Sequence, residues 1–190
     1  MTAAARQQVP KTALIARRWL AQPTVVFLDT ETTGLDDTAE ICEIAILDRQ
    51  GAILMDQRIR PRRPIPATAT SIHGITDADV ANCPTWPMVA PAVARALRDR
   101  PLIIYNASYD LRLLAQTAEG YQLDPPVRAA TCAMRLYAEH YGERDDLRGG
   151  YRWQKLSVAA QQMGLRVPSD LHAARADAEL TRRLLMAVAA

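Results

Sequence analysis

The stretch VVFLDTETTGLDD, residues 25–37, is the natural starting point for interpreting this chain. It begins as an apolar run, which is typical of a buried strand, and ends in two carboxylates, Asp29 and Glu31. Side chains at positions i and i+2 of a strand point to the same side, so the two acids are expected to converge beyond the strand's end. Such close carboxylates raise each other's pKa unless a cation lies between them, and a divalent metal is the natural cation.

The surrounding pattern predicts an α/β domain with a mixed sheet flanked by helices. Gly51 marks a tight turn between two strands, which must then be antiparallel. Residues 60–76 are expected to form an irregular loop, because their prolines cannot join a ladder. The expected strands are 24–28, 41–50, 52–61 and 101–106, and the expected helices are 85–99, 108–120, 131–142, 155–164 and 172–190.

The first 28 residues contain basic side chains and no acid. That composition is allowed for an organellar transit peptide, but the serine enrichment of such peptides is missing. Residues 11–22 are better interpreted as an amphipathic helix that stops before Pro23. We therefore expect a helical arm over residues 1–22 and one domain over residues 23–190.

Composition narrows the class of protein. The chain has 190 residues, 49% hydrophobic content and a net charge of +2, so any nucleic-acid partner must be held by a local patch. The 3 cysteines lack metal-ligand spacing, and their odd number argues against a disulfide framework, which favours a reduced, cytoplasmic setting. No apolar run is long enough to span a bilayer, so no membrane association is expected.

Further acids follow in the sequence. Asp110 comes after the apolar run at 101–106, and Asp177 lies in the last expected helix, five residues after His172. We expect His172 to lie just before that helix, where its ring can swing over a site that Asp177 faces. Each has a plainer alternative, since Asp110 could be an acid at a helix start and His172 a surface histidine.

Four motifs in series resemble one family. DTETTGL at 29–35, HGIT at 73–76, NASYD at 106–110 and H-x-x-x-x-D at 172–177 occur in the order found in DEDDh exonucleases. These include the proofreading epsilon subunit of bacterial DNA polymerase III and, more distantly, RNase T and oligoribonuclease. The resemblance implies an RNase H-like fold with a five-stranded mixed sheet, of which one strand is antiparallel.

The resemblance also implies a reaction, the 3′-to-5′ hydrolysis of phosphodiesters to nucleoside 5′-monophosphates. Asp29, Glu31, Asp110 and Asp177 would hold two Mg²⁺ or Mn²⁺ ions, with Asp29 bridging them, and His172 would be the general base. An all-oxygen site suits these cations and not Zn²⁺. Histidine as a residue type titrates near neutral pH, so it can accept a proton from water there.

Substrate contacts are expected at the same motifs. Thr32 would bind the terminal nucleotide by its backbone and hydroxyl, Leu35 would pack on a base, and His73 would reach the 3′ end. The further residues expected at the substrate are Thr33, Gly34, Asn106 and Tyr109. Tyr105 and Tyr109 depart from the family's frequent histidine and phenylalanine, which could alter packing near Asp110.

Two loops could grip a nucleic acid. Residues 58–64 cluster four arginines, and residues 147–155 mix Arg148, Arg152 and Lys155 with Tyr151 and Trp153. Cations interleaved with aromatic rings suit a single strand. The alternatives are a solvated edge for the arginine run and a core anchor for Trp153.

The favoured activity is therefore a metal-dependent exonuclease acting on single-stranded DNA with a free 3′ end, in a repair or proofreading setting. The chain stops at Ala190, without the tail that the polymerase subunit uses, which argues against stable polymerase association. An RNA-trimming exoribonuclease is the alternative enzyme, because a sensor of the 2′-hydroxyl is not readable from sequence. The third reading is a non-catalytic nucleic-acid-binding module, although such modules usually lose a metal ligand.

Overall fold

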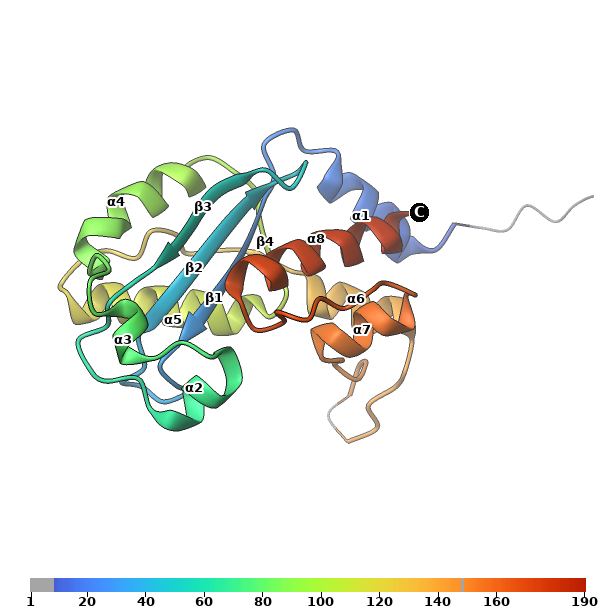
Figure 1. Cartoon of the computed structure of the whole chain (residues 1–190). Helices are drawn as coiled ribbons and strands as arrows, with labels where there is room; N and C mark the ends of the chain where they lie inside the picture. Colours follow the sequence, from blue (N-terminus) through green and yellow to red (C-terminus); the bar gives the residue numbers. More distant parts are fainter. Residues whose placement is uncertain (1–8, 148) are drawn as a thin grey trace, which may run out of the picture.

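A computed structural model of the chain describes residues 9–147 and 149–190. Five strands form one sheet in the order β3-β2-β1-β4-β5, with β1 at its centre (Figure 1). The strands are β1 (Val26–Thr32), β2 (Ile41–Asp48), β3 (Ile53–Arg58), β4 (Leu102–Ile104) and β5 (Thr131–Cys132). β2 is antiparallel to both β1 and β3, whereas β1, β4 and β5 are parallel. The expected mixed sheet with one antiparallel strand is confirmed.

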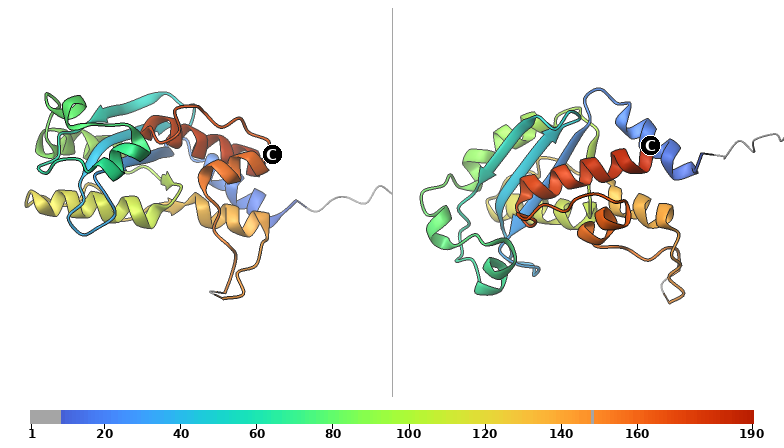
Figure 2. Two further views of the ribbon diagram at one scale, coloured as in Figure 1. Left: turned by 60° about the horizontal axis from the view of Figure 1, so that its bottom comes forward. Right: turned by 45° about the vertical axis from the view of Figure 1, so that its right-hand side comes forward.

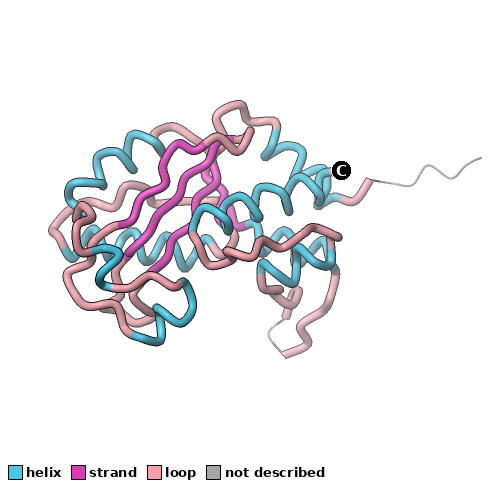
Figure 3. The backbone as a smooth tube through the Cα atoms, viewed as in Figure 1, coloured by secondary structure: helices cyan, strands magenta, loops and turns pink. Residues whose placement is uncertain are grey.

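Helices cover both faces of this sheet (Figure 3). They are α1 (Lys11–Leu20), α2 (Ala67–His73), α3 (Asp77–Val80), α4 (Trp86–Leu97), α5 (Ala107–Gly120), α6 (Ala133–Tyr141), α7 (Leu156–Gln162) and α8 (Ala174–Ala189). The left view of Figure 2 shows α5 on one side of the sheet and α8 on the other. The arrangement is the RNase H-like α/β fold that the motifs imply.

The alternation of β1 side chains divides the interior into two cores. Val26 and Leu28 belong to a cluster with the apolar faces of α4 and α5. Val25 and Phe27 belong to a second cluster with α1, α6, α7 and α8. Helices thus cover both faces of the apolar part of β1, and the polar residues of the candidate site lie at the C-terminal end of the strand.

Three expectations about local structure were wrong. The first strand, expected over 24–28, is β1 and continues to Thr32, because its pairing with β2 extends that far, so Asp29 and Glu31 lie within the strand. Residues 60–76 contain α2 and lead into α3, because the prolines that bar a strand lie before α2, and Pro66 occupies its N-cap. Thr76 and Asp79 then form a capping box that begins α3. The helix expected at 131–142 begins only at Ala133, because Thr131 and Cys132 pair with β4.

The N-terminal helix α1 packs against α6 and α8 and contributes the buried Ala16 to the second core. The Arg17 guanidinium donates hydrogen bonds to the carbonyl oxygens of Ala189 and Ala190, at 2.6 and 2.8 Å. The division into an arm (1–22) and a domain (23–190) stays a prediction, and its first eight residues lie outside the described ones. Among the described residues, no helix is both long and apolar enough to cross a membrane.

Candidate active site

The end of β1 carries the first two carboxylates. Asp29 and Glu31 follow the alternation of Val25 and Phe27, so they face the α8 side of the sheet. Glu31 is buried although its side chain is a carboxyl. The strand thus directs both acids of the Asp-Thr-Glu motif toward the start of α8.

Asp177 in α8 and His172 just before this helix lie close to Glu31. Single ligand atoms of Glu31, His172 and Asp177 all lie within 4.8 Å of one another. His172 lies two residues before α8 in a left-handed conformation with φ of 70°, and its N–H donates to Oδ1 of Asp177 at 3.4 Å. Its Nδ1 is 4.0 Å from Oδ2 of Asp177. The histidine lies before the helix, as the sequence indicated.

Asp110 reaches the cluster from the opposite face of the sheet. It lies in the first turn of α5 and is buried. Its Oδ1 accepts a hydrogen bond of 2.8 Å from the hydroxyl of Thr30, the residue between the two β1 acids. The four acidic positions predicted from the sequence come from three separate elements and lie near enough for their charges to interact. Among the described residues, only Glu31 and Asp177 join His172 in the group of ligand atoms within 4.8 Å.

Burial raises the pKa of all four carboxyls, and repulsion from neighbouring acids of the cluster adds to this for Asp29, Glu31 and Asp110. Desolvation and then the charges of Asp110 and Asp177 hold the pKa of Asp29 well above its ordinary range. Desolvation and neighbouring carboxylates raise the pKa of Glu31 to about 9. Burial raises the pKa of Asp110 to about 7 and also raises that of Asp177. A bound cation would relieve this repulsion, so these carboxyls are the residues that could hold a metal.

The loop after β1 is held by hydroxyl contacts. The Thr32 hydroxyl donates to the carbonyl of Gly34 at 3.0 Å and lies 2.6 Å from the hydroxyl of Tyr109. Tyr109 also donates to the same Gly34 carbonyl at 3.1 Å. The Thr33 hydroxyl accepts from the N–H of Glu40 at 2.9 Å, whereas Leu35 is 77% exposed. The loop thus presents an apolar side chain from a fixed backbone.

His73 belongs to the same wall. Its Nδ1 accepts a hydrogen bond of 3.0 Å from the N–H of Ile75, so Nε2 carries the proton and faces the carbonyl of Thr32 at 3.2 Å. Burial lowers the pKa of His73, in agreement with a neutral ring. The histidine reaches the expected loop, and its contact with a 3′ end stays a prediction.

A cavity of about 520 Å³ opens beside His172 and Asp177. Asn106, Trp153 and Lys155 are among its lining residues, and Trp153 is 54% exposed. The exposure excludes the alternative of Trp153 as a core anchor. An exposed ring in the lining of the same cavity as Lys155 and His172 suits the stacking role expected from the sequence.

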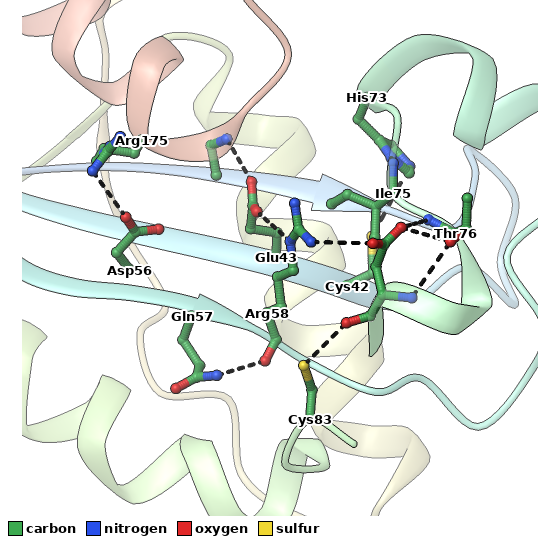
Figure 4. A network of polar contacts seen from close by, with 12 residues as sticks. Cys42, Glu43, Asp56, Gln57, Arg58, His73, Ile75, Thr76, Cys83 and Arg175 are labelled. Atoms are coloured by element: carbon green, nitrogen blue, oxygen red, sulfur yellow. Dashed lines mark hydrogen bonds and ion pairs between the residues drawn. The ribbon is translucent and has the colours of Figure 1, made fainter. Parts of the chain in front are cut away.

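Four other arginines of the two loops contact protein acceptors. Arg152 forms an ion pair of 2.8 Å with Glu143, and Arg148 lies outside the described residues. In the arginine run, Arg62 pairs with Glu40 at 3.2 Å, and Arg60 donates to the carbonyl of Ala81. Arg58 pairs with Glu43 at 3.3 Å (Figure 4). These three guanidiniums of the arginine run contact protein acceptors beside β2 and β3, so they are less available to a nucleic acid.

Sequence reasoning missed Glu43. It is buried in β2, within the apolar stretch ICEIAILD, and its Oε2 accepts from the N–H of Ala174 at 2.9 Å. A charge inside an apolar strand was the available signal, because burying it requires a partner.

Comparison with known proteins agrees with this geometry. A family model described as an exonuclease, of the RNase T type, matches residues 26–185. The uncharacterised exonuclease CP81 of Escherichia phage 186 is 43% identical over 180 residues, which cover 92% of each chain. A DNA polymerase III epsilon-like protein of Rhodobacter capsulatus is 30% identical over 93% of this chain, which spans only 26% of that protein.

Solved structures share the fold. Exonuclease X in complex with 5′-overhanging duplex DNA is 27% identical with a TM-score of 0.61, over 85% of this chain and 90% of that one. The nuclease domain of 3′hExo, a DEDDh family member bound to rAMP, has a TM-score of 0.66 at 18% identity, over 84% and 88% of the two chains. The DEDDh resemblance of the sequence is thereby confirmed, and the chain belongs to the RNase T family of exonucleases.

Proposed function

We propose that this protein is a metal-dependent 3′–5′ exonuclease that hydrolyses phosphodiesters at the 3′ end of single-stranded DNA and releases nucleoside 5′-monophosphates. The observation that carries the proposal is the close group of Glu31, His172 and Asp177, together with the buried Asp29 and Asp110, whose raised pKa values report the charges of the same acids. The cavity at their border holds an exposed tryptophan and a lysine, which suits a single strand.

The donor set fits two Mg²⁺ or Mn²⁺ ions. All four proposed ligands are carboxylates, which these hard cations prefer. The groups that most strongly raise the pKa of Glu31 beyond its own burial are the carboxyls of Asp177, Glu43 and Asp110, so cations would relieve their repulsion. Bound ions of this kind neutralise phosphate charge and lower the pKa of water. In this proposal Asp29, whose pKa burial and neighbouring acids hold well above its ordinary range, would be a ligand of both ions.

His172 is proposed as the general base. Its Nδ1 faces Asp177, which leaves Nε2 to accept the proton of the attacking water. Its side chain is half-exposed, so the ring can turn toward a bound end. Asp177 would orient the ring as well as serve as a ligand.

The terminal nucleotide would lie against the loop after β1. Leu35 would pack on the base, while Thr32 and His73 would contact the 3′ end. Asn106 and Trp153 would guide the preceding nucleotide through the cavity. RNA remains the alternative substrate, and the binding of rAMP by the similar 3′hExo nuclease domain favours testing it. A cytoplasmic location and a repair or proofreading role stay predictions of the sequence.

Digestion of end-labelled strands tests the proposal. Single-stranded and duplex DNA and RNA would be incubated with Mg²⁺, Mn²⁺ or EDTA, beside a circular single strand. We expect metal-dependent loss of 3′ nucleotides from linear strands, no cutting of the circle, and no turnover by Asp29→Asn. Undiminished digestion in EDTA or by Asp29→Asn would overturn the metal assignment, and cutting of the circle would overturn the exonuclease assignment.

A further inference from the structure

Glu43 lies in an unfavourable place for a carboxylate. In the antiparallel pairing of β1 and β2, Glu43 is directly opposite Glu31, and both are buried. Like charges directly opposite each other destabilise a strand pair. Glu43 also raises the pKa of Glu31. An acid that adds to the repulsion within the cluster needs a compensating role, and its partners indicate one.

Both oxygens of Glu43 are engaged by the protein. Oε2 accepts the hydrogen bond from the N–H of Ala174, and Oε1 lies 3.3 Å from Nε of Arg58 on the neighbouring strand. Nη1 of Arg58 in turn lies 3.6 Å from Oδ1 of Asp79, a residue of the capping box that begins α3. Figure 4 shows this row of contacts from the start of α8 across β2 and β3 to Thr76.

The contact with Ala174 supplies what the sequence of α8 lacks. The first N–H groups of a helix have no partner within it, and a side-chain acceptor at the N-cap usually satisfies one of them. The N-cap of α8 is Ala173, which makes no side-chain cap hydrogen bond. Glu43, which is 131 residues away in sequence, provides the acceptor, and its charge suits the positive end of the helix dipole.

We propose that Glu43 is a positioning residue that caps α8 from β2 and thereby holds His172 and Asp177 against the β1 acids. Ala174 lies two residues after His172 and three before Asp177, so fixing its N–H fixes the backbone between them. The inference rests on the proposed function for its effect on catalysis. It assigns Glu43 no contact with metal or substrate.

Four variants test the proposal. Glu43→Ala removes the acceptor, whereas Glu43→Gln keeps an oxygen for the Ala174 N–H and removes the charge. Asp56→Asn is the matched control, because Asp56 pairs with Arg175 at 3.5 Å at the same helix end without touching the backbone. The double variant Glu43→Ala/Ala173→Ser restores a cap from within α8, since Ala173 already has the extended conformation of an N-cap.

The kinetic readout is kcat against KM on a 3′-labelled strand. Because loss of a supporting contact behind metal ligands typically costs about 10- to 100-fold, Glu43→Ala should lower kcat within that range with little change in KM. Glu43→Gln and Asp56→Asn should stay within about threefold, and the double variant should recover part of the loss. The glutamine and double variants keep the test decisive if Glu43→Ala fails to fold.

The second readout needs no activity. Amide hydrogen exchange over residues 172–178 of the metal-free protein should be faster in Glu43→Ala than in wild type and close to wild type in the other variants. Unchanged exchange and kcat in Glu43→Ala would overturn the proposal. The proposal would also be overturned if Glu43→Gln lowered kcat as much as Glu43→Ala and excess Mn²⁺ restored kcat in both variants. Glu43 would then be a metal ligand. A wild-type protein that digests no nucleic acid would contradict the proposed function alone, and exchange would still decide the capping.

Discussion

The hydroxyl of Thr30 joins two halves of the site through its hydrogen bond of 2.8 Å to Oδ1 of Asp110. Asp29 and Glu31 face α8, so the residue between them faces α5, where Asp110 lies. The middle residue of Asp-Thr-Glu therefore holds the third carboxylate in place. Both partners are buried, which makes the bond costly to lose.

Thr30→Val should weaken metal binding near neutral pH. The hydrogen bond from Thr30 lowers the pKa of Asp110, so its loss should raise that pKa further above its ordinary value. Protons then compete with metal up to a higher pH. Titration with Mn²⁺ should show a loss of affinity that shrinks as the pH rises. Thr30→Ser, which keeps the hydroxyl, is the control, and equal affinities in all three proteins at every pH would contradict the argument.

The metal-free protein should lose stability as the pH rises. In the unfolded chain the acids ionise near pH 4, whereas in the fold the pKa of Asp110 is about 7 and that of Glu31 about 9. Between these limits the folded state binds more protons than the unfolded one, so the free energy of unfolding falls with rising pH. Each pKa unit corresponds to about 1.4 kcal/mol, and 1 kcal/mol moves the Tm of such a chain by about 2 to 4 °C.

Thermal melting in EDTA at pH values between about 5 and 8 would measure this slope. Added Mg²⁺ should raise the Tm more at the upper end, where the carboxylates are ionised. In Asp29→Asn the Tm should fall less steeply with pH, and at the highest pH it should exceed the wild-type Tm, because one repelling acid is gone. A metal-free protein that is most stable at the upper end would refute the assignment.

His172→Ala should lower turnover without weakening metal binding, whereas Asp177→Ala should weaken metal binding. Loss of a general base typically costs about a hundred- to ten-thousand-fold in turnover, while the carboxylates still hold the metals. His172→Ala should therefore keep near-normal Mn²⁺ affinity and gain nothing from excess Mn²⁺. Asp177→Ala should bind metal weakly and recover partly with excess Mn²⁺. If added metal rescues His172→Ala, the histidine is a ligand, which its closeness to Glu31 and Asp177 allows.

Tyr109→Phe should raise KM with little change in kcat. The substitution removes the hydroxyl contacts with Thr32 and Gly34 that fix the loop presenting Leu35. At about 0.5 to 1.5 kcal/mol for a net hydrogen bond, KM should rise roughly 2- to 10-fold. Tyr121→Phe is the control, because its buried hydroxyl has no hydrogen-bond partner among the described residues. An unchanged KM in Tyr109→Phe would show that the loop is fixed without this hydroxyl.

Trp153→Ala should weaken single-strand binding by about 1 to 3 kcal/mol if a base stacks on the ring. Its Tm should change little, because the side chain is half-exposed. Trp153→Phe should retain most of the affinity. Arg152→Ala alone should change binding less, because its charge is paired with Glu143. Normal binding by Trp153→Ala would remove the cavity from the proposed substrate path.

The fold was predictable wherever a local pattern had enough residues to show itself. The apolar run before Asp29 is a property of a short segment, and it predicted the existence of β1 but not its end, because residues 29–32 are polar and are held in the strand by pairing with β2. β5 has only two residues, too few for any periodicity, and only its pairing with β4 defines it. In 60–76 the prolines masked α2, because they exclude a ladder without excluding a helix that starts after them.

The sequence by itself identified the family of this protein, because the four motifs and their order along the chain resemble the DEDDh exonucleases. The metal-assisted hydrolysis that these residue types suit stays a proposal. Only the tertiary structure decided which charges are available. In the fold, Arg58 and Arg62 pair with buried acids, and Trp153 is exposed in the cavity that His172 also lines. Glu43 accepts the hydrogen bond from the first N–H of α8. The physical reason is that a charge is neutralised by its neighbours in space, and across a sheet these come from distant parts of the chain.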